Sequence, residues 1–166
     1  MVRAVSLRDW NDARPSKRLT FGGAKQEKWN IAMVKEMVVK ESLSSELISA
    51  GAELTRQLDD ARLLIDACLW FYTTDSNAWR FIIASPEVRA HGPKWMYKKI
   101  QTVIFKMPPE QPTIPLKDIS VVDDQDPLIA LLRVLIRTGD EISNIRFSQI
   151  VINGALIEDA YIYRIR

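Results

Sequence analysis

Cysteine and histidine are almost absent from this sequence, since each occurs once, as Cys68 and His91, among 166 residues. A single cysteine cannot close an intrachain disulfide. The scarcity of both residue types argues against zinc sites and leaves any Cys/His or Ser/His/Asp catalytic arrangement dependent on one residue. We therefore expect a cytoplasmic protein of a reducing compartment that uses no cofactor.

Long apolar runs are missing as well. None approaches the roughly 20 residues that a membrane span requires, and the first residues lack the apolar stretch of a secretory signal. Hydrophobic residues nevertheless make up 47% of the chain, and its length suits one domain with its own core. We expect a soluble protein that contacts no membrane.

The net charge is only +2, which is too small for the strong basic field of a dedicated nucleic-acid-binding protein. Its distribution is uneven, because residues 63–106 carry a net +3 and residues 107–166 a net −3. Residues 1–28 hold seven basic side chains against three acidic ones. The sequence therefore predicts a basic N-terminal segment, a basic middle and an acidic end.

The first 24 residues show neither a helical nor a strand period, and a proline and two glycines interrupt them. We expect a basic arm over residues 1–24 that is flexible or ordered by a partner, followed by one domain over residues 25–166. The spacing of apolar residues predicts two amphipathic helices, over residues 25–40 and 44–58, which form a helical hairpin.

Short β-rich runs and further helix signals fill the rest of the chain. Ser85-Pro86 and Pro93 are typical helix starts, because proline presets φ in the first turn. An almost wholly apolar helix after Asp126-Pro127 is expected to lie buried against a sheet. The expected strands are 63–72, 78–84, 119–122, 145–152 and 155–165, and the expected helices are 86–92, 93–106 and 128–136.

This order of elements lacks regular strand–helix–strand alternation. We therefore predict an α+β fold with a mainly antiparallel sheet of about five strands, covered on one face by helices, together with the N-terminal basic arm and helical hairpin.

Asn153-Gly154 is the clearest local signal, because both positions tolerate positive φ and favour a two-residue type I′ turn. Such a turn fixes the register of the flanking strands, so that the numbers of paired residues sum to 307. One face of this hairpin, which carries Ile145, Phe147, Gln149 and Val151, is expected to be core-like. The other face is expected to be exposed to solvent or to a partner, and it carries Arg146, Asp159, Tyr161 and Tyr163.

Asp123, Asp124 and Asp126 lie between a strand and a helix, where carboxylates can hold a divalent cation. A solvated acidic loop with Asp126 as a helix cap is the favoured interpretation. A metal-dependent hydrolase that uses Asp124, Asp126 and Glu158 is therefore only a third hypothesis. His91 stands at a helix break, where capping is favoured over catalysis, so we assign no catalytic residue and no metal ligand.

Aromatic and basic residues alternate in the basic middle of the chain. Because bases stack on aromatic rings while phosphates contact cations, this composition suits single-stranded nucleic acid, although a solvated helix face has the same composition. Binding of nucleic acid is the alternative hypothesis, and its candidate residues are Trp79, Arg80, Lys94, Trp95, Lys98 and Lys99.

The leading hypothesis is a small intracellular accessory or binding module, bacterial in style, rather than an enzyme. We expect it to engage a protein partner or a second copy through its arm and first helix, where aromatic residues and methionines give an adaptable apolar surface. The candidate residues are Trp10, Phe21, Trp29, Met33 and Met37.

Overall fold

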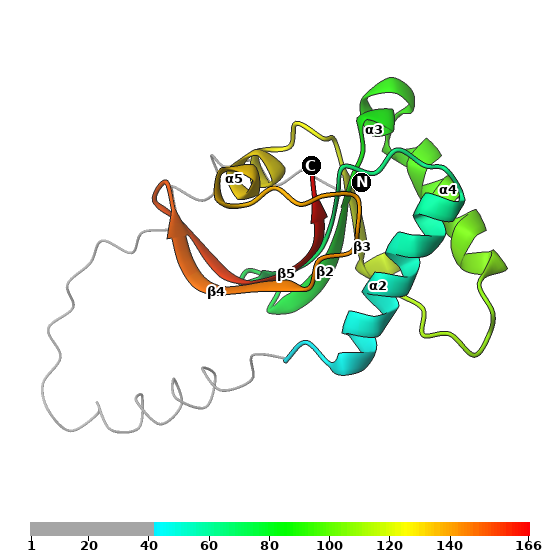
Figure 1. Ribbon diagram of the computed structural model, residues 1–166, viewed down its shortest axis with the longest axis horizontal. Helices are drawn as coiled ribbons and strands as arrows, with labels where there is room; N and C mark the ends of the chain where they lie inside the picture. The colour runs from blue at the N-terminus through cyan, green and yellow to red at the C-terminus, as the bar shows by residue number, and fades with distance from the viewer. Residues whose placement is uncertain (1–41) are drawn as a thin grey trace, which may run out of the picture. The chain divides into compact units, whose positions relative to one another are not determined.

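The computed structural model describes residues 42–166, and every structural statement below concerns that part of the chain (Figure 1). The arm predicted over residues 1–24 and the helix predicted over residues 25–40 lie outside the described residues.

One five-stranded sheet forms the centre of the described part, with the strand order β3-β2-β1-β5-β4. Neighbouring strands are antiparallel except for β2 and β3, which are parallel. The sheet is therefore mixed rather than mainly antiparallel as predicted, because the chain crosses from β2 through two helices before it adds β3. The strands are β1 (Ala67–Thr73), β2 (Ala78–Ala84), β3 (Ile119–Val122), β4 (Ile145–Ile152) and β5 (Ala155–Ile165).

Helices cover both faces of this sheet, which corrects the prediction that they cover one. Two of the longer helices, α2 and α4, lie on one side of the sheet, and α5 lies on the other (Figure 1). The helices are α2 (Ser45–Asp60), α3 (Pro86–His91), α4 (Pro93–Lys106) and α5 (Pro127–Leu135), with a short 3₁₀ turn η1 (Leu116–Asp118). No helix in residues 42–166 combines the length and apolar character needed to traverse a lipid bilayer.

Helix starts follow the local signals in the sequence. The side chains of Ser44, Ser85 and Asp126 each accept a backbone N–H from the first turn of the helix that follows. These contacts satisfy donors that would otherwise lack an intrahelical partner. The prediction that Asp126 caps a helix is confirmed.

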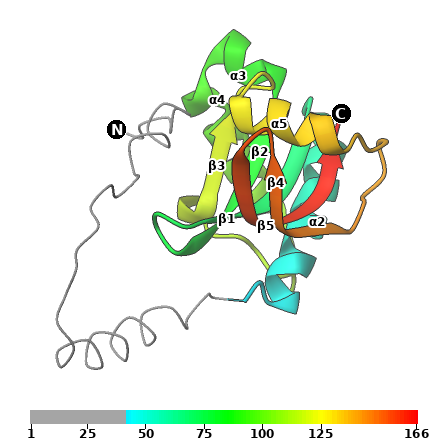
Figure 2. The ribbon, with the colours of Figure 1, turned by 90° about the vertical axis from the view of Figure 1, so that its left-hand side faces the viewer.

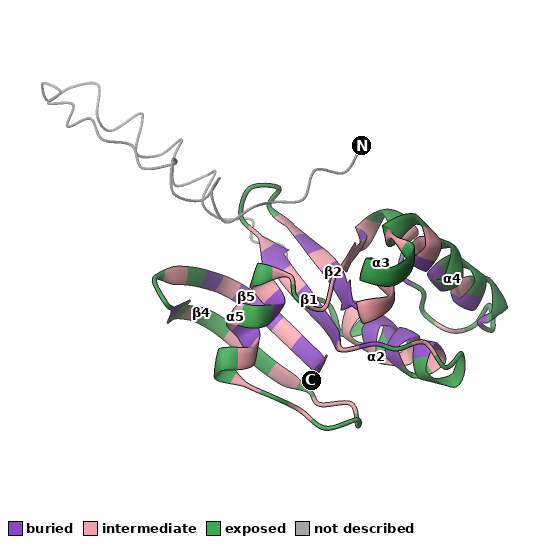
Figure 3. Cartoon of the chain, turned by 90° about the horizontal axis from the view of Figure 1, so that it is seen from above, coloured by how far each residue is buried: buried purple, intermediate pink, exposed green. Residues whose placement is uncertain are grey.

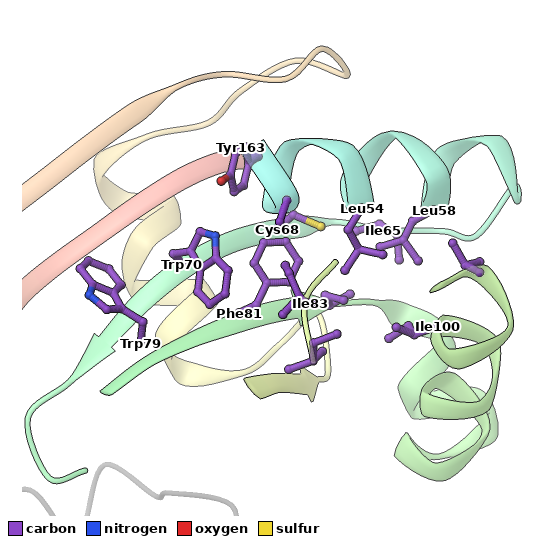
Figure 4. Close-up of a cluster of buried hydrophobic side chains, with 14 of the residues drawn as sticks. Leu54, Leu58, Ile65, Cys68, Trp70, Trp79, Phe81, Ile83, Ile100 and Tyr163 are labelled. Atoms are coloured by element: carbon purple, nitrogen blue, oxygen red, sulfur yellow. The ribbon is translucent and has the colours of Figure 1, made fainter. Parts of the chain in front are cut away.

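The two helix layers create two cores, because side chains along a strand alternate between the faces of the sheet. In β1, Cys68 and Trp70 face α2 and α4, while Ala67 and Leu69 face α5 (Figure 4). A central strand buried on both faces accounts for the nearly unbroken apolar run that the sequence shows here.

A bulge between β1 and β5 turns two consecutive residues toward α2. Leu69 pairs with Ile162 and Cys68 with Arg164, so Tyr163 is the extra residue on β5. The Tyr163 hydroxyl donates to the carbonyl oxygen of Ile48 at 2.6 Å. Arg164 forms a bidentate ion pair with Asp59, at 2.6 and 2.7 Å.

The hairpin of β4 and β5 (Figure 2) has the predicted register. Ile145, Phe147 and Ile162 face the core as predicted, but the facing is reversed toward the tip. Asn153 and Gly154 have φ of 48° and 81°, and every observed pair sums to 307. Gln149, however, has φ of 51° and breaks the alternation of β4. Toward the tip, Ile150 and Ile157 therefore join the core, whereas Val151, expected to be inward, is 65% exposed.

The outer edge of β3 is closed by a tyrosine from α4. The Tyr97 hydroxyl donates to the Ile119 carbonyl at 3.1 Å and accepts the Val121 N–H at 3.2 Å. On the side toward β2, the Val122 carbonyl accepts the N–H of Ser85. Tyr97 thus occupies the backbone positions that a further strand would use.

Candidate nucleic-acid interface

Helix α4 begins at a sharp break in the chain. Gly92 has φ of 84°, which L-residues with a Cβ rarely adopt, and Pro93 occupies the first turn. The break separates α4 from α3 and lets α4 take its own direction against the sheet. Met96, Ile100 and Val103 form its buried stripe.

The opposite side of α4 is exposed and carries cations and one aromatic ring (Figure 3). At 3.6 residues per turn, Lys94, Lys98, Gln101 and Phe105 lie within about 60° of one another around the helix axis. All four are exposed, and Phe105 is 90% exposed. We call these four residues the outer stripe of α4.

A second stripe flanks the outer stripe and consists of Trp95, Lys99, Thr102 and Lys106. The half-buried Trp95 ring lies 4.5 Å from the His91 ring, with a tilt of 32°. The Lys99 Nζ lies 5.1 Å from the centre of the same indole. Both neighbours are exposed, so the Trp95 ring lies against an exposed imidazole and beneath an exposed ammonium group.

The charge on this surface has one sign. Residues 88–109 include no aspartate or glutamate. Arg89, the one arginine of this segment, is held by Asp123 at 2.8 Å and also pairs with Asp124. None of the ion pairs within residues 42–166 involves any of the four α4 lysines. Their charge is therefore available to an anionic partner.

The six residues predicted for nucleic acid do not form one surface. Lys94, Trp95, Lys98 and Lys99 lie together on α4. Trp79 is only 6% exposed and packs edge-on against Tyr72, with ring centres 5.4 Å apart. Arg80 points to the opposite face of β2 and donates to the Lys117 carbonyl at 2.5 Å. Burial thus removes Trp79 from this interface, and the side chain of Arg80 is removed from it because it points to the opposite face of β2.

Phe105 lies on the exposed side of α4 but is not among the six residues predicted to bind nucleic acid. The helical period already placed Met96, Ile100 and Val103 inward, and position 105 falls opposite that stripe. A large apolar residue on the outward side of a predicted helix was the available signal.

The sheet face predicted to be exposed is largely covered. Tyr163 is buried under α2, and Asp159 is 2% exposed and bonded to Arg146 at 2.8 and 3.0 Å. Tyr161 is half-buried, and only Arg146 of the four is exposed. The prediction is wrong because α2 and the loop before β4 cover this face of β4 and β5.

Two of the three residues predicted for a hydrolase are engaged in structural contacts, since Asp124 pairs with Arg89 and Asp126 caps α5. Hydrogen bonds from Arg89 hold the pKa of Asp123 well below its usual range, whereas burial raises the pKa of Asp126 at its capping position. Within the described residues, no three His, Cys, Asp or Glu side chains are grouped to hold a metal ion. Burial also raises the pKa of the Cys68 thiol to about 12, so this thiol stays protonated at neutral pH.

The residues predicted to bind a protein partner, which are Trp10, Phe21, Trp29, Met33 and Met37, lie outside the described residues. Comparison of the chain with protein-family models, with curated proteins and with solved structures finds no match.

Proposed function

We propose that this protein is a binding module for nucleic acid and that the exposed side of α4 is its contact surface. One observation carries the proposal: four exposed lysines share one helix that has no acidic side chain, and none of them pairs with a carboxylate of residues 42–166. A nucleic-acid backbone carries regularly spaced phosphates, so it can contact several ammonium groups of such a row at once.

The low charge of the described part sets how this binding would work. Residues 42–166 hold 14 basic and 16 acidic side chains, a net −2, so no general basic field surrounds the domain. Attraction would come from α4 itself and act over about one Debye length, roughly 10 Å at 0.1 M salt. Affinity is therefore expected to be moderate and strongly dependent on salt.

Fluorescence anisotropy of a labelled 20-nucleotide DNA, titrated with the full chain, tests this function. If all four lysines contact phosphates of a single strand, the slope of log affinity against log salt is about −2.8. Affinity then falls about 50-fold between 50 and 200 mM salt. Binding that is absent at low salt, or insensitive to salt, would refute the proposal.

Charge reversal locates the surface. Lys98→Glu combined with Lys99→Glu is expected to abolish most of the binding and to flatten the salt slope. Arg137→Glu is the matched control, because Arg137 is an exposed cation in the segment after α5, on the other side of the sheet. Equal losses in the double variant and the control would exclude α4 as the contact surface.

A protein partner held by residues 1–40 stays a prediction from the sequence. Deletion of residues 1–24 tests it, because the hypothesis requires a change in captured partners or in oligomeric state.

A further inference from the structure

We propose that the α4 surface selects single-stranded over double-stranded nucleic acid and that Phe105 is the platform on which a base stacks. This inference rests on the proposed function and adds to it a ligand class and a residue. The Phe105 ring lies among the lysines of α4.

Among residues 42–166, Phe105 is the most exposed of the large apolar residues, at 90% against 66% for Val134. Its ring gains almost nothing from the fold, since the buried stripe of α4 consists of Met96, Ile100 and Val103. Lone exposed apolar residues are common on protein surfaces. Phe105 differs because every charged neighbour on its helix is a cation.

The geometry of the outer stripe matches a short stretch of single strand. Lys98 lies two helical turns before Phe105, about 10 Å along the axis. That distance corresponds to about three nucleotides at a rise of 3.4 Å. A base on the Phe105 ring therefore places a phosphate about three nucleotides away within reach of Lys98. Lys106, on the flanking stripe, can contact a phosphate next to the stacked base.

Trp95 is less suited to this role, although the sequence favoured it. Its half-buried ring already contacts His91 and carries the Lys99 ammonium near its centre. A base would have to displace one of these neighbours. Phe105 offers its ring without such competition.

Stacking on Phe105 distinguishes the two forms of nucleic acid. A single strand can present the face of an unpaired base to the ring, whereas the bases of a duplex are stacked on one another and present only phosphates to a convex helix. The lysines contact both forms. Only the single strand gains the stacking contact.

The test compares labelled single-stranded dT20 with a 20-base-pair duplex of mixed sequence at 50 mM salt, using the full chain. The wild type is expected to bind the single strand about tenfold more tightly. Phe105→Ala is expected to weaken single-strand binding about tenfold and to change duplex binding less than twofold, while Phe105→Trp retains the preference. Val134→Ala, which truncates an exposed residue of α5, is expected to change neither.

The remaining outcomes separate failure of the stacking role from failure of the proposed function. Equal affinity for both polymers, or an equal effect of Phe105→Ala on both, overturns the stacking role while salt-dependent binding keeps the proposed function. Loss of binding to both polymers in Lys98→Glu/Lys99→Glu, with Phe105→Ala silent, has the same meaning. Binding to vesicles of anionic lipid that depends on Phe105, without binding to either polymer, overturns both proposals. Circular dichroism confirms that each variant is folded.

Discussion

At the scale of single residues, Gly51 lets helix α2 pack directly against the side chain of Tyr163. A Cβ placed on Gly51 would lie 2.5 Å from the Tyr163 hydroxyl and 2.7 Å from two ring carbons. Tyr163 cannot retreat, because its hydroxyl bonds to Ile48 on the same helix and its backbone sits in the bulge of β5. Glycine at position 51 therefore sets how closely α2 approaches the sheet.

Gly51→Ala is expected to lower the free energy of unfolding by about 1–3 kcal/mol, because the added methyl group overpacks this contact. Gly139→Ala is the control, since nothing lies within 4 Å of its added Cβ, and it is expected to change stability by less than about 0.5 kcal/mol. Urea denaturation of both variants measures the difference. Equal values for the two variants would show that α2 shifts freely.

Some of these residue-level features could be predicted from sequence and others could not. Gly51 lies on the apolar face of the helix predicted over residues 44–58, where glycine costs helix propensity but allows a neighbouring element to approach closely. The positive φ of Gln149 could not be predicted, since glutamine, unlike asparagine, is not enriched in that conformation. Its effect on facing is why Val151 and Ile150 exchanged their predicted environments.

At the scale of elements, local signals were sufficient wherever a proline, a cap or a tight turn fixed a boundary. The predicted bounds of β2, α4, β4 and β5 agree with the structure. Side-chain caps and a type I′ turn act over three or four residues, so a single sequence contains them in full. The parallel pairing of β3 with β2 could not be predicted, because a strand of four residues contains no signal for its partner or its direction.

Tyr97→Phe tests how the edge of β3 is held. Removal of the hydroxyl deletes two hydrogen bonds to β3 and is expected to cost about 1 kcal/mol. Hydrogen exchange of the Val121 amide should accelerate more than that of amides in β1. Tyr161→Phe, at a half-buried tyrosine of β5, is the control and should leave Val121 exchange unchanged. Unaltered Val121 exchange in Tyr97→Phe would mean that the hydroxyl does not protect this edge.

At the scale of the whole described part, an ion pair joins α2, β5 and the loop before β4. Arg164 is 1% exposed, pairs with Asp59 at the end of α2, and donates to the carbonyl of Asp140. A buried guanidinium that loses its carboxylate is left as an uncompensated charge. The pair therefore makes three distant segments of the chain depend on one another.

Asp59→Ala is expected to lower the free energy of unfolding by about 3 kcal/mol, because Arg164 stays buried without its counter-ion. Asp60→Ala removes an exposed carboxylate one residue further on and is expected to change it by less than about 0.5 kcal/mol. Thermal and urea denaturation monitored by circular dichroism compare the two. A loss of less than 1 kcal/mol in Asp59→Ala would show that water replaces the carboxylate.

The hydroxyl of Tyr97 also limits how copies of this sheet can add to one another. Because Tyr97 occupies the backbone of β3, the edge that the sheet of residues 42–166 leaves for a further strand is that of β4, the other outermost strand. Two copies that paired through β4 would each cover this edge of the other. Edge-to-edge association through the described sheet would therefore end at a pair and would not propagate into a fibre.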